Sequence, residues 1–140
     1  MAIKQLSVFV ENKKGSLHEI TDVLAKANID LRSMCIADSS DYGIVRIIAD
    51  DVDRAKEVLN NAGHIANVRN VTAFAVPDKP GGLAQVLSIL EDNGVEIEYM
   101  YALVTTSVDK AYAVMRTNDE TVTEKLLSDN AIEILSEKNI

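Results

Sequence analysis

Two short segments of the sequence combine a glycine with polar residues at the start of a helical pattern, and both are suited to bind a small charged molecule. One runs from Glu11 to Leu17 (ENKKGSL) and the other from Pro77 to Leu83 (PDKPGGL). Glycine permits a positive φ and a close backbone approach, and the first turn of a helix presents unpaired N–H groups that favour a carboxylate. The side chain of Asn12 or Asp78 would hold an ammonium group nearby. Together these groups match the two ends of a free amino acid.

The same residues also have a purely structural interpretation. Asn, Asp and Gly are ordinary turn and cap residues between a strand and a helix. A duplication copies structural turns as faithfully as it copies binding sites. The residues alone therefore leave both interpretations open.

The two segments belong to an internal repeat, which decides the expected fold. Residues 12–34 and 78–100 align without a gap, with 66 residues between Gly15 and Gly81. The alternation and helical spacing of apolar residues predict the order βαββαβ in each copy. In the first copy we expect strands at 3–10, 29–37, 42–49 and 64–70, with helices starting near Gly15 and Asp51. In the second we expect strands at 71–77, 95–105, 110–117 and 131–136, with helices at 81–93 and 119–129.

The predicted fold class is α+β, with two ferredoxin-like units, 1–70 and 71–140. Each unit would have an antiparallel four-stranded sheet with two helices on one face, so its other face should be polar if it meets water. Apolar residues lie out of phase with the helix-facing positions: Phe9, Met34, Ile36, Ile48, Ala73, Ala75, Met100, Ala102 and Val104. We therefore expect a second covering surface, formed by the other unit, by a second subunit, or by both.

Composition and charge exclude several classes of function. The net charge is −8, and residues 71–140 carry 5 Lys/Arg against 12 Asp/Glu, so nucleic acid and anionic membranes are poor partners. One cysteine, Cys35, cannot form a disulfide within the chain, and no signal core or membrane span is evident. We expect a soluble cytoplasmic protein.

The sequence offers no catalytic, metal or cofactor motif. His18 and Asp22 stand four residues apart on a helix, but the second copy has Ala84 and Ser88 there and no third ligand is visible. Phosphate-binding and nucleophile motifs are absent. We expect no catalytic residues, no metal and no cofactor.

The pattern Asn/Asp-x-Pro-Gly-x-Leu, followed by apolar residues at helical spacing, resembles the ACT domain. The residues 78–83 fit it fully, and the tandem resemblance covers the whole chain. The first copy keeps Asn12 and Gly15 but has Lys14 where proline is usual. ACT domains are βαββαβ modules that bind amino acids and regulate metabolic enzymes.

The resemblance implies a ligand site where the turn of one module meets a neighbouring module. Carried over to this sequence, the candidate ligand-binding residues are Asn12, Gly15, Ser16, Leu17, Asp78, Gly81, Gly82 and Leu83, with Ile29 and Val95 as weaker candidates. If one site alone works, we expect it to be the second.

The function expected from these features is that of an amino-acid-binding regulatory or sensor protein without catalytic activity. We expect a free-standing sensor or a subunit acting in trans on a metabolic enzyme, most simply as a homodimer. The alternative is an interaction module that binds a metabolic enzyme and has no ligand of its own. A weaker option is an enzyme with a site that no motif reveals.

Overall fold

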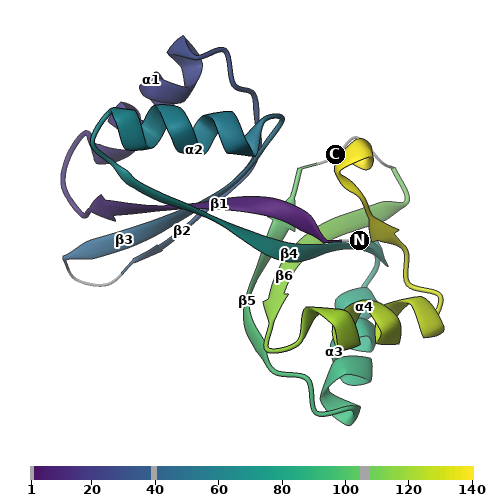
Figure 1. Ribbon diagram of the computed structural model, residues 1–140. Helices are drawn as coiled ribbons and strands as arrows, with labels where there is room; N and C mark the ends of the chain where they lie inside the picture. The colour runs from purple at the N-terminus through teal and green to yellow at the C-terminus, as the bar shows by residue number, and fades with distance from the viewer. Residues whose placement is uncertain (1, 39–40, 105–107) are drawn as a thin grey trace. The chain divides into compact units, whose positions relative to one another are not determined.

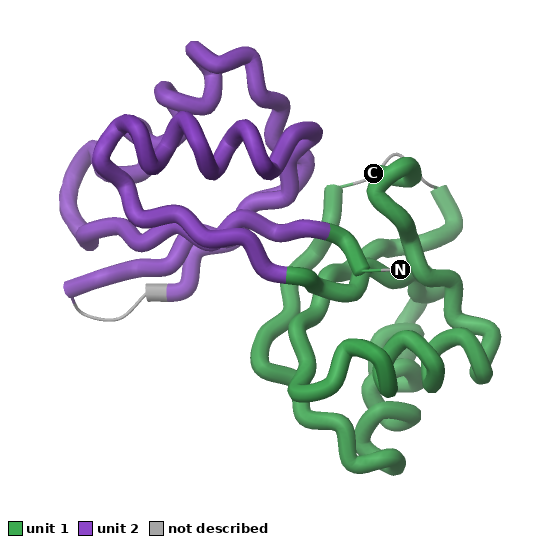
Figure 2. The backbone as a smooth tube through the Cα atoms, in the orientation of Figure 1, with its two compact units in different colours: residues 1–3, 70–140 green, residues 4–69 purple. Residues whose placement is uncertain are grey.

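The computed structural model describes residues 2–38, 41–104 and 108–140. The chain forms two compact units, shown in Figure 2: an N-terminal unit of residues 4–69 and a C-terminal unit of residues 70–140 together with 1–3. The predicted domains, 1–70 and 71–140, stay a prediction, because compactness does not show that either part folds by itself.

Each unit follows the predicted order of strands and helices (Figure 1). The elements from the N-terminus are β1 (Ile3–Glu11), α1 (Ser16–Lys26), β2 (Leu31–Asp38), β3 (Tyr42–Ala49), α2 (Val52–Asn61) and β4 (Ile65–Pro77). They continue with α3 (Gly82–Asp92), β5 (Ile97–Leu103), β6 (Lys110–Thr117), α4 (Glu120–Asp129), β7 (Ile134–Leu135) and a short 3-10 helix, η1 (Glu137–Asn139). None of the helices in the described ranges is long and apolar enough to cross a membrane.

The strand order confirms the predicted fold class. The strands pair in the order β2-β3-β1-β4 in the N-terminal unit and β5-β6-β4-β7 in the C-terminal unit. The first strand of each unit therefore lies between the third and the fourth, as in a ferredoxin-like βαββαβ module. The registers of β1 with β3, β2 with β3, β4 with β6, and β5 with β6 are all antiparallel.

One strand takes part in both units. The sequence predicted a strand at 64–70 followed by another at 71–77, but β4 is continuous from Ile65 to Pro77. Its first part is the fourth strand of the N-terminal unit, and its second part is the first strand of the C-terminal unit and pairs with β6. No glycine or proline stands between the two parts, and Asn70 at the junction does not interrupt the strand.

Each unit has its own core between its sheet and its two helices. In the N-terminal unit, α1 and α2 lie on the same side of the sheet (Figure 1). Their buried residues Ile20, Leu24, Ala55 and Leu59 join side chains of β1 and β3 in one cluster. In the C-terminal unit the corresponding cluster is formed by Phe74, Val76, Val86, Leu90, Ala113, Met115 and Leu127. Burial of these apolar side chains is the main force that holds each helix pair on its sheet.

The prediction of which apolar residues lie on the open face of each sheet was partly wrong. Met34 pairs with Ile47, and Ile36 with Val45, so both lie on the helix side of the sheet. Register shifts between Leu31 and Ser33, and likewise between Ile97 and Tyr99, are the cause. One extra residue in a strand moves every later side chain to the opposite face. The same shift puts Met100 and Ala102 on the helix side, opposite Met115 and Ala113. Phe9, Ile48, Ala73 and Ala75 keep the predicted alternation.

The last strand is shorter than predicted. It was expected over 131–136, but β7 consists of Ile134 and Leu135. Ala131 has a φ of 59°, which places it in the turn after α4. At the other end, Ser136 starts η1, where its backbone and side chain both bond to Asn139.

Candidate functional site

The two glycine turns have the same backbone hydrogen bonds. Four backbone N–H groups of the first turn donate to carbonyl oxygens. The bonds run from Asn12 to Asp41 over 2.9 Å, from Lys13 to Glu11 over 2.9 Å, from Ser16 to Lys13 over 3.3 Å, and from Glu19 to Gly15 over 3.0 Å. The second turn has the four equivalent bonds to carbonyl oxygens. They run from Asp78 to Asp109 over 3.2 Å, from Lys79 to Pro77 over 2.9 Å, from Gly82 to Lys79 over 3.1 Å, and from Gln85 to Gly81 over 3.1 Å. The repeat in sequence is therefore a repeat in backbone geometry.

A left-handed glycine precedes the helix in each turn. Gly15 has a φ of 87° and Gly81 a φ of 85°, and neither helix start receives a side-chain cap from the described residues. The other two helices are capped by Asp51 and Asp119, which accept from the N–H groups of Arg54 and Val122 over 3.0 Å. The helices that follow the glycine turns thus lack the acidic caps found on the other two.

The missing caps leave backbone donors available at α1 and α3. Among the described residues, no backbone acceptor pairs with the N–H groups of Leu17 and His18, or with those of Leu83 and Ala84. Unpaired N–H groups at a helix start, together with the helix dipole, favour an anion. Each turn can therefore accept a carboxylate at the same position.

Asn12 and Asp78 lie at matching places beside these donors. Both residues are exposed. Each backbone N–H bonds to the chain just before the third strand of its unit, at Asp41 or Asp109, which holds the residue in place. No partner for either side chain is found in the described ranges, so the amide or carboxylate oxygen is free to accept a bond from an ammonium group.

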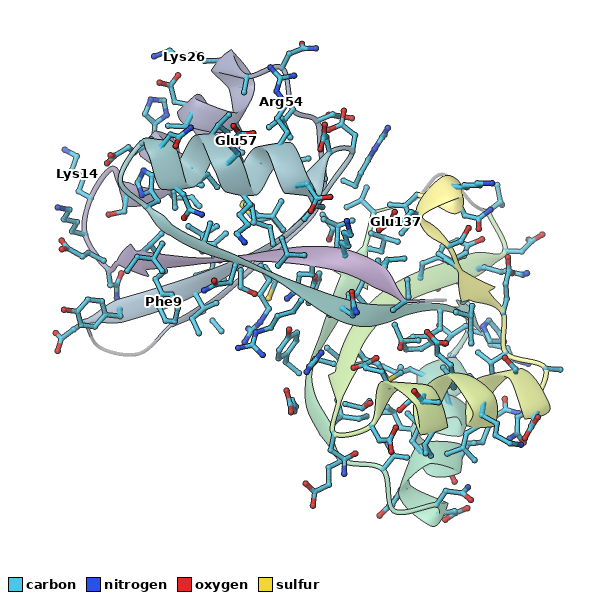
Figure 3. The ribbon with its side chains drawn as sticks, viewed as in Figure 1. Phe9, Lys14, Lys26, Arg54, Glu57 and Glu137 are labelled. Atoms are coloured by element: carbon cyan, nitrogen blue, oxygen red, sulfur yellow. The ribbon has the colours of Figure 1, made fainter. Side chains whose placement is uncertain are left out.

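The second turn is more tightly built than the first. A Cβ added at Gly82 would lie 2.2 Å from the carbonyl oxygen of Pro77, so a larger residue there must displace the backbone. The first turn has Ser16 at this position. It also has Lys14 in place of Pro80, and Figure 3 shows the Lys14 side chain extending away from the unit. These differences agree with the better fit of the second copy to the sequence pattern.

The remaining predicted residues do not form one cluster around the turns. Leu17 packs against the N-terminal core, whereas Leu83 is 36% exposed. Ile29 is 7% exposed and belongs to the N-terminal core, and its N–H donates to Leu24. Val95 lies at the edge of the other core with the same bond, to Leu90. Ile29 and Val95 thus support the fold within their own units.

Each unit also has a hollow at the end of its sheet, which the sequence did not predict. The hollow in the N-terminal unit has a volume of about 310 Å³ and is lined by Phe9, Val10, Glu11, Lys13, Ser16, Glu19, Tyr42, Gly63, His64 and Ile65. The hollow in the C-terminal unit has a volume of about 390 Å³ and is lined by Ala75, Val76, Pro77, Gln85, Val86, Asp109, Lys110, Asn130, Ala131, Ile132 and Glu133. Of the predicted ligand-binding residues, Ser16 alone lines either hollow. The hollows bring together residues far apart in the sequence, so no local motif could have revealed them.

The pair His18 and Asp22 shows no sign of holding a metal. Asp22 forms an ion pair with Lys26 over 2.8 Å. The bond from Lys26 lowers the pKa of the Asp22 carboxyl. Within the described ranges, no three His, Cys, Asp or Glu side chains come together as a metal site would require.

Comparison with known proteins places the chain in a family. Its sequence matches the family model described as an ACT domain pair over residues 1–140. The chain belongs to the ACT domain pair family. Among curated proteins, no sequence matches it. The resemblance seen in the two glycine turns is therefore confirmed for the whole chain.

Several solved structures share this fold. Protein BT0572 from Bacteroides thetaiotaomicron is 39% identical, with a TM-score of 0.91 over 98% of this chain and 94% of its own. The regulatory subunit of aspartate kinase from Thermus thermophilus, in its ligand free form, is 14% identical, with a TM-score of 0.67 over 90% of this chain and 91% of its own. The same subunit from Thermus flavus is 16% identical, with a TM-score of 0.64 over 89% and 88%. At 14% and 16% identity the likeness shows the fold alone.

Proposed function

We propose that this ACT domain pair binds a small free amino acid at its glycine turns and regulates another protein, without catalysing a reaction itself. The observation that carries the proposal is the contrast between the helix starts. Asp51 and Asp119 cap the N-termini of α2 and α4. In contrast, α1 and α3 follow Gly15 and Gly81 and receive no side-chain cap from the described part of the chain. The free N–H groups would accept the carboxylate of the amino acid.

The proposed site consists of the turn of one module and the surface of a neighbouring one. Asn12 or Asp78 would accept bonds from the ammonium group, while the backbone around Gly15–Leu17 or Gly81–Leu83 would hold the carboxylate. Ile29 and Val95, which precede β2 and β5, would act through their packing in the cores of the two units. The neighbour would be supplied by a second chain in a cytoplasmic homodimer, since twofold pairs are the commonest oligomers. A metabolic enzyme bound in trans would be the regulated partner.

A thermal-shift screen of the twenty amino acids tests the proposal. At about 100 times its dissociation constant, a ligand stabilises the protein by about 2.7 kcal/mol, which raises the Tm by several degrees. We expect one or a few amino acids to give this shift. A flat response across the panel would contradict amino-acid binding and favour the interaction module.

Substitution of the two turn glycines ranks the sites. A Cβ added at Gly15 or Gly81 would meet open space, so the Cβ of a valine there strains φ without itself clashing. We expect Gly81→Val to reduce the ligand-induced shift more than Gly15→Val, because the second turn is the more tightly built. Gly94→Val is the matched control, since Gly94 has a φ of 72° and open space but lies after α3, away from the turn. Equal losses at Gly15 and Gly81 would argue against the ranking.

Regulation requires that the ligand bind two states of the protein, or of its complex, with different affinity.

Light scattering with and without the effective amino acid measures the oligomeric state. We expect a dimer of about twice the 15.3 kDa chain mass. A monomer at every concentration would remove the second chain as the neighbouring module.

A further inference from the structure

The hollow at the end of the N-terminal sheet lies beside the glycine turn, with which it shares Lys13 and Ser16, and has a chemistry of its own. It lies where β1 ends, where β3 and β4 begin, and beside the first turn of α1. The C-terminal unit has a hollow at the equivalent place. A hollow of about 310 Å³ is large enough for a small metabolite.

The backbone builds this hollow in the same way in both units. After α2, the N–H groups of Gly63 and His64 donate to Asn60 and Leu59 over 3.1 and 3.0 Å. After α4, the N–H groups of Ala131 and Ile132 donate to Ser128 and Leu127 over 3.1 and 2.9 Å. Gly63 has a φ of 90°, and Ala131 keeps a φ of 59° although it carries a Cβ. The backbone turn after the second helix is therefore a feature of the fold, present in both units. The side chains around it determine which ligand could bind in each hollow.

The N-terminal hollow contains an exposed carboxylate that pairs with neither lysine nor arginine in the described ranges. Glu19 is 62% exposed, and no Lys or Arg of the described residues pairs with it. Its ionisable neighbour is His64, whose buried Nε2 lies 3.5 Å from the Glu19 Oε1 and forms no hydrogen bond there. Gln85 and Ile132 stand at the equivalent places of the other unit. The fold therefore does not require an ionisable pair in this position.

The second carboxylate of the N-terminal hollow, that of Glu11, already forms an ion pair within the unit. Glu11 pairs with Lys13 over 3.0 Å, and this bond raises the pKa of Lys13. Among the described residues, Lys13 is the one lysine or arginine that lines the hollow. Because Lys13 already pairs with Glu11, an anionic ligand would have to compete with Glu11 for it. Lys13 also interacts with Glu19 through space, as a weaker cause of its raised pKa, but its ion pair is with Glu11. The exposed Glu19 carboxylate can therefore receive the positive charge of a ligand.

Exposed apolar side chains line the same hollow. Phe9, Tyr42 and Ile65 are 48%, 61% and 64% exposed. The equivalent residues of the C-terminal unit are Ala75, Lys110 and Glu133, and the last two form an ion pair. Since the fold accepts a small residue and an ion pair at these positions, it does not demand the three large apolar residues. Aromatic rings beside a carboxylate favour a cation that carries an apolar body.

We propose that the Glu19 hollow of the N-terminal unit is a second ligand site, which binds a small molecule with a cationic amine on an apolar body. The ammonium group donates to Glu19, and the apolar body contacts Phe9, Tyr42 and Ile65. The equivalent hollow of the C-terminal unit, with Gln85 and the Lys110–Glu133 pair, does not bind this class of ligand.

Benzylamine is a suitable probe, with benzyl alcohol and benzoate as neutral and anionic controls of the same shape. We expect saturable changes in the amide NMR signals of the ¹⁵N-labelled full chain around Glu19 and His64 with benzylamine. Benzyl alcohol and benzoate are expected to bind at least about tenfold more weakly, the factor expected for a lost hydrogen bond to a charged group. Equal binding of benzyl alcohol, or no saturable change with benzylamine, would overturn the proposal.

Substitutions taken from the other unit locate the site. Glu19→Gln introduces the residue found at Gln85, and we expect it to weaken benzylamine binding at least about tenfold. The control is Glu57→Gln, which removes the same charge from an exposed position of α2 (Figure 3), a residue that does not line the hollow. The double variant Tyr42→Lys, Ile65→Glu copies the Lys110–Glu133 pair and is expected to abolish binding. Benzylamine binding that survives both changes would overturn the proposal, whereas the amino-acid response at the glycine turns is expected to persist in both.

Discussion

Gly82 is the residue whose type the backbone of the candidate site restricts most. A Cβ at this position would meet the carbonyl oxygen of Pro77 at 2.2 Å. The first turn makes the same hydrogen bonds with Ser16 in this place, so the two turns differ in the room that the backbone leaves. The sequence showed that a glycine is present, but the close contact with Pro77 appears only when both ends of the turn are in place.

Exchange of the two residues measures this difference. We expect Gly82→Ser to lower the free energy of unfolding by about 1–3 kcal/mol, because the strand end and the helix start must move apart. Ser16→Gly should cost less than about 1 kcal/mol, since it adds backbone freedom at one position. Urea unfolding followed by circular dichroism measures both. Similar losses for the two variants would show that the turns are equally tolerant.

At the scale of elements, the turns after the second helices carry the clearest strain. Ala131 adopts a φ of 59° after α4, while the equivalent residue after α2 is Gly63, with a φ of 90°. For a residue with a Cβ this conformation costs about 1–2 kcal/mol, whereas glycine adopts it freely.

Exchange of these residues is expected to change stability in opposite directions. Ala131→Gly should stabilise the protein by about 0.5–1 kcal/mol, and Gly63→Ala should destabilise it by about 1 kcal/mol. The midpoint of urea unfolding reports both effects. A loss of stability in Ala131→Gly would show that the alanine methyl group makes packing contacts that outweigh the strain.

Ion pairs along the helices give the stability a defined pH dependence. Lys26 lowers the pKa of Asp22 below its ordinary 3.8, so the pair stabilises the fold above that pH and loses this effect as the pH falls through the lowered value. Asp129 raises the pKa of Lys125 above its ordinary 10.5, so this pair stabilises the fold below that pH and loses its effect as the pH rises through the raised value. Both pairs are exposed and therefore weak.

Removal of one cation isolates the acid side of this dependence. We expect Lys26→Gln to lower the urea midpoint slightly at pH 7 and to have no effect at a pH well below 3.8, where Asp22 is protonated in both proteins. The difference at pH 7 should shrink in about 1 M salt, which screens exposed charges. A difference that persisted at low pH would show that Lys26 acts through its aliphatic stem or through the dipole of α1, in whose last turn it lies.

Several elements could be predicted from local sequence because their signals are local. The strand Tyr42–Ala49 has the predicted bounds, and Asp51 and Asp119 cap the helices that were expected to start there. The faces of β2 and β5 could not be predicted. Their register shifts depend on pairing with β3 and β6, and a single extra residue reverses the alternation from which the face is read.

At the scale of the whole molecule, β4 links the folding of the two units. Its thirteen residues supply one strand to each sheet without a break at the boundary between the units. Loss of one sheet would leave half of this strand without its ladder, which exposes unpaired backbone groups. We therefore expect the two units to unfold together.

Two tryptophan reporters test this coupling, since the chain has no tryptophan of its own. Phe9→Trp reports on the N-terminal unit, and Tyr112→Trp reports on the C-terminal unit. We expect coincident urea transitions for the two reporters and for circular dichroism, as two-state unfolding requires. A separate earlier transition for either reporter would show that its unit unfolds alone.

The sequence by itself determined the duplication, the βαββαβ order, the fold class and the place of the glycine turns, because each of these is written in local spacing and in the repeat. Only the tertiary structure decided which face the side chains after the bulges occupy, that β4 runs through both units, and that α1 and α3 start without side-chain caps from the described residues. It also brought Glu19, His64 and Tyr42 around one hollow from three separate parts of the chain. These features depend on contacts between residues far apart in the chain, which no window of sequence contains.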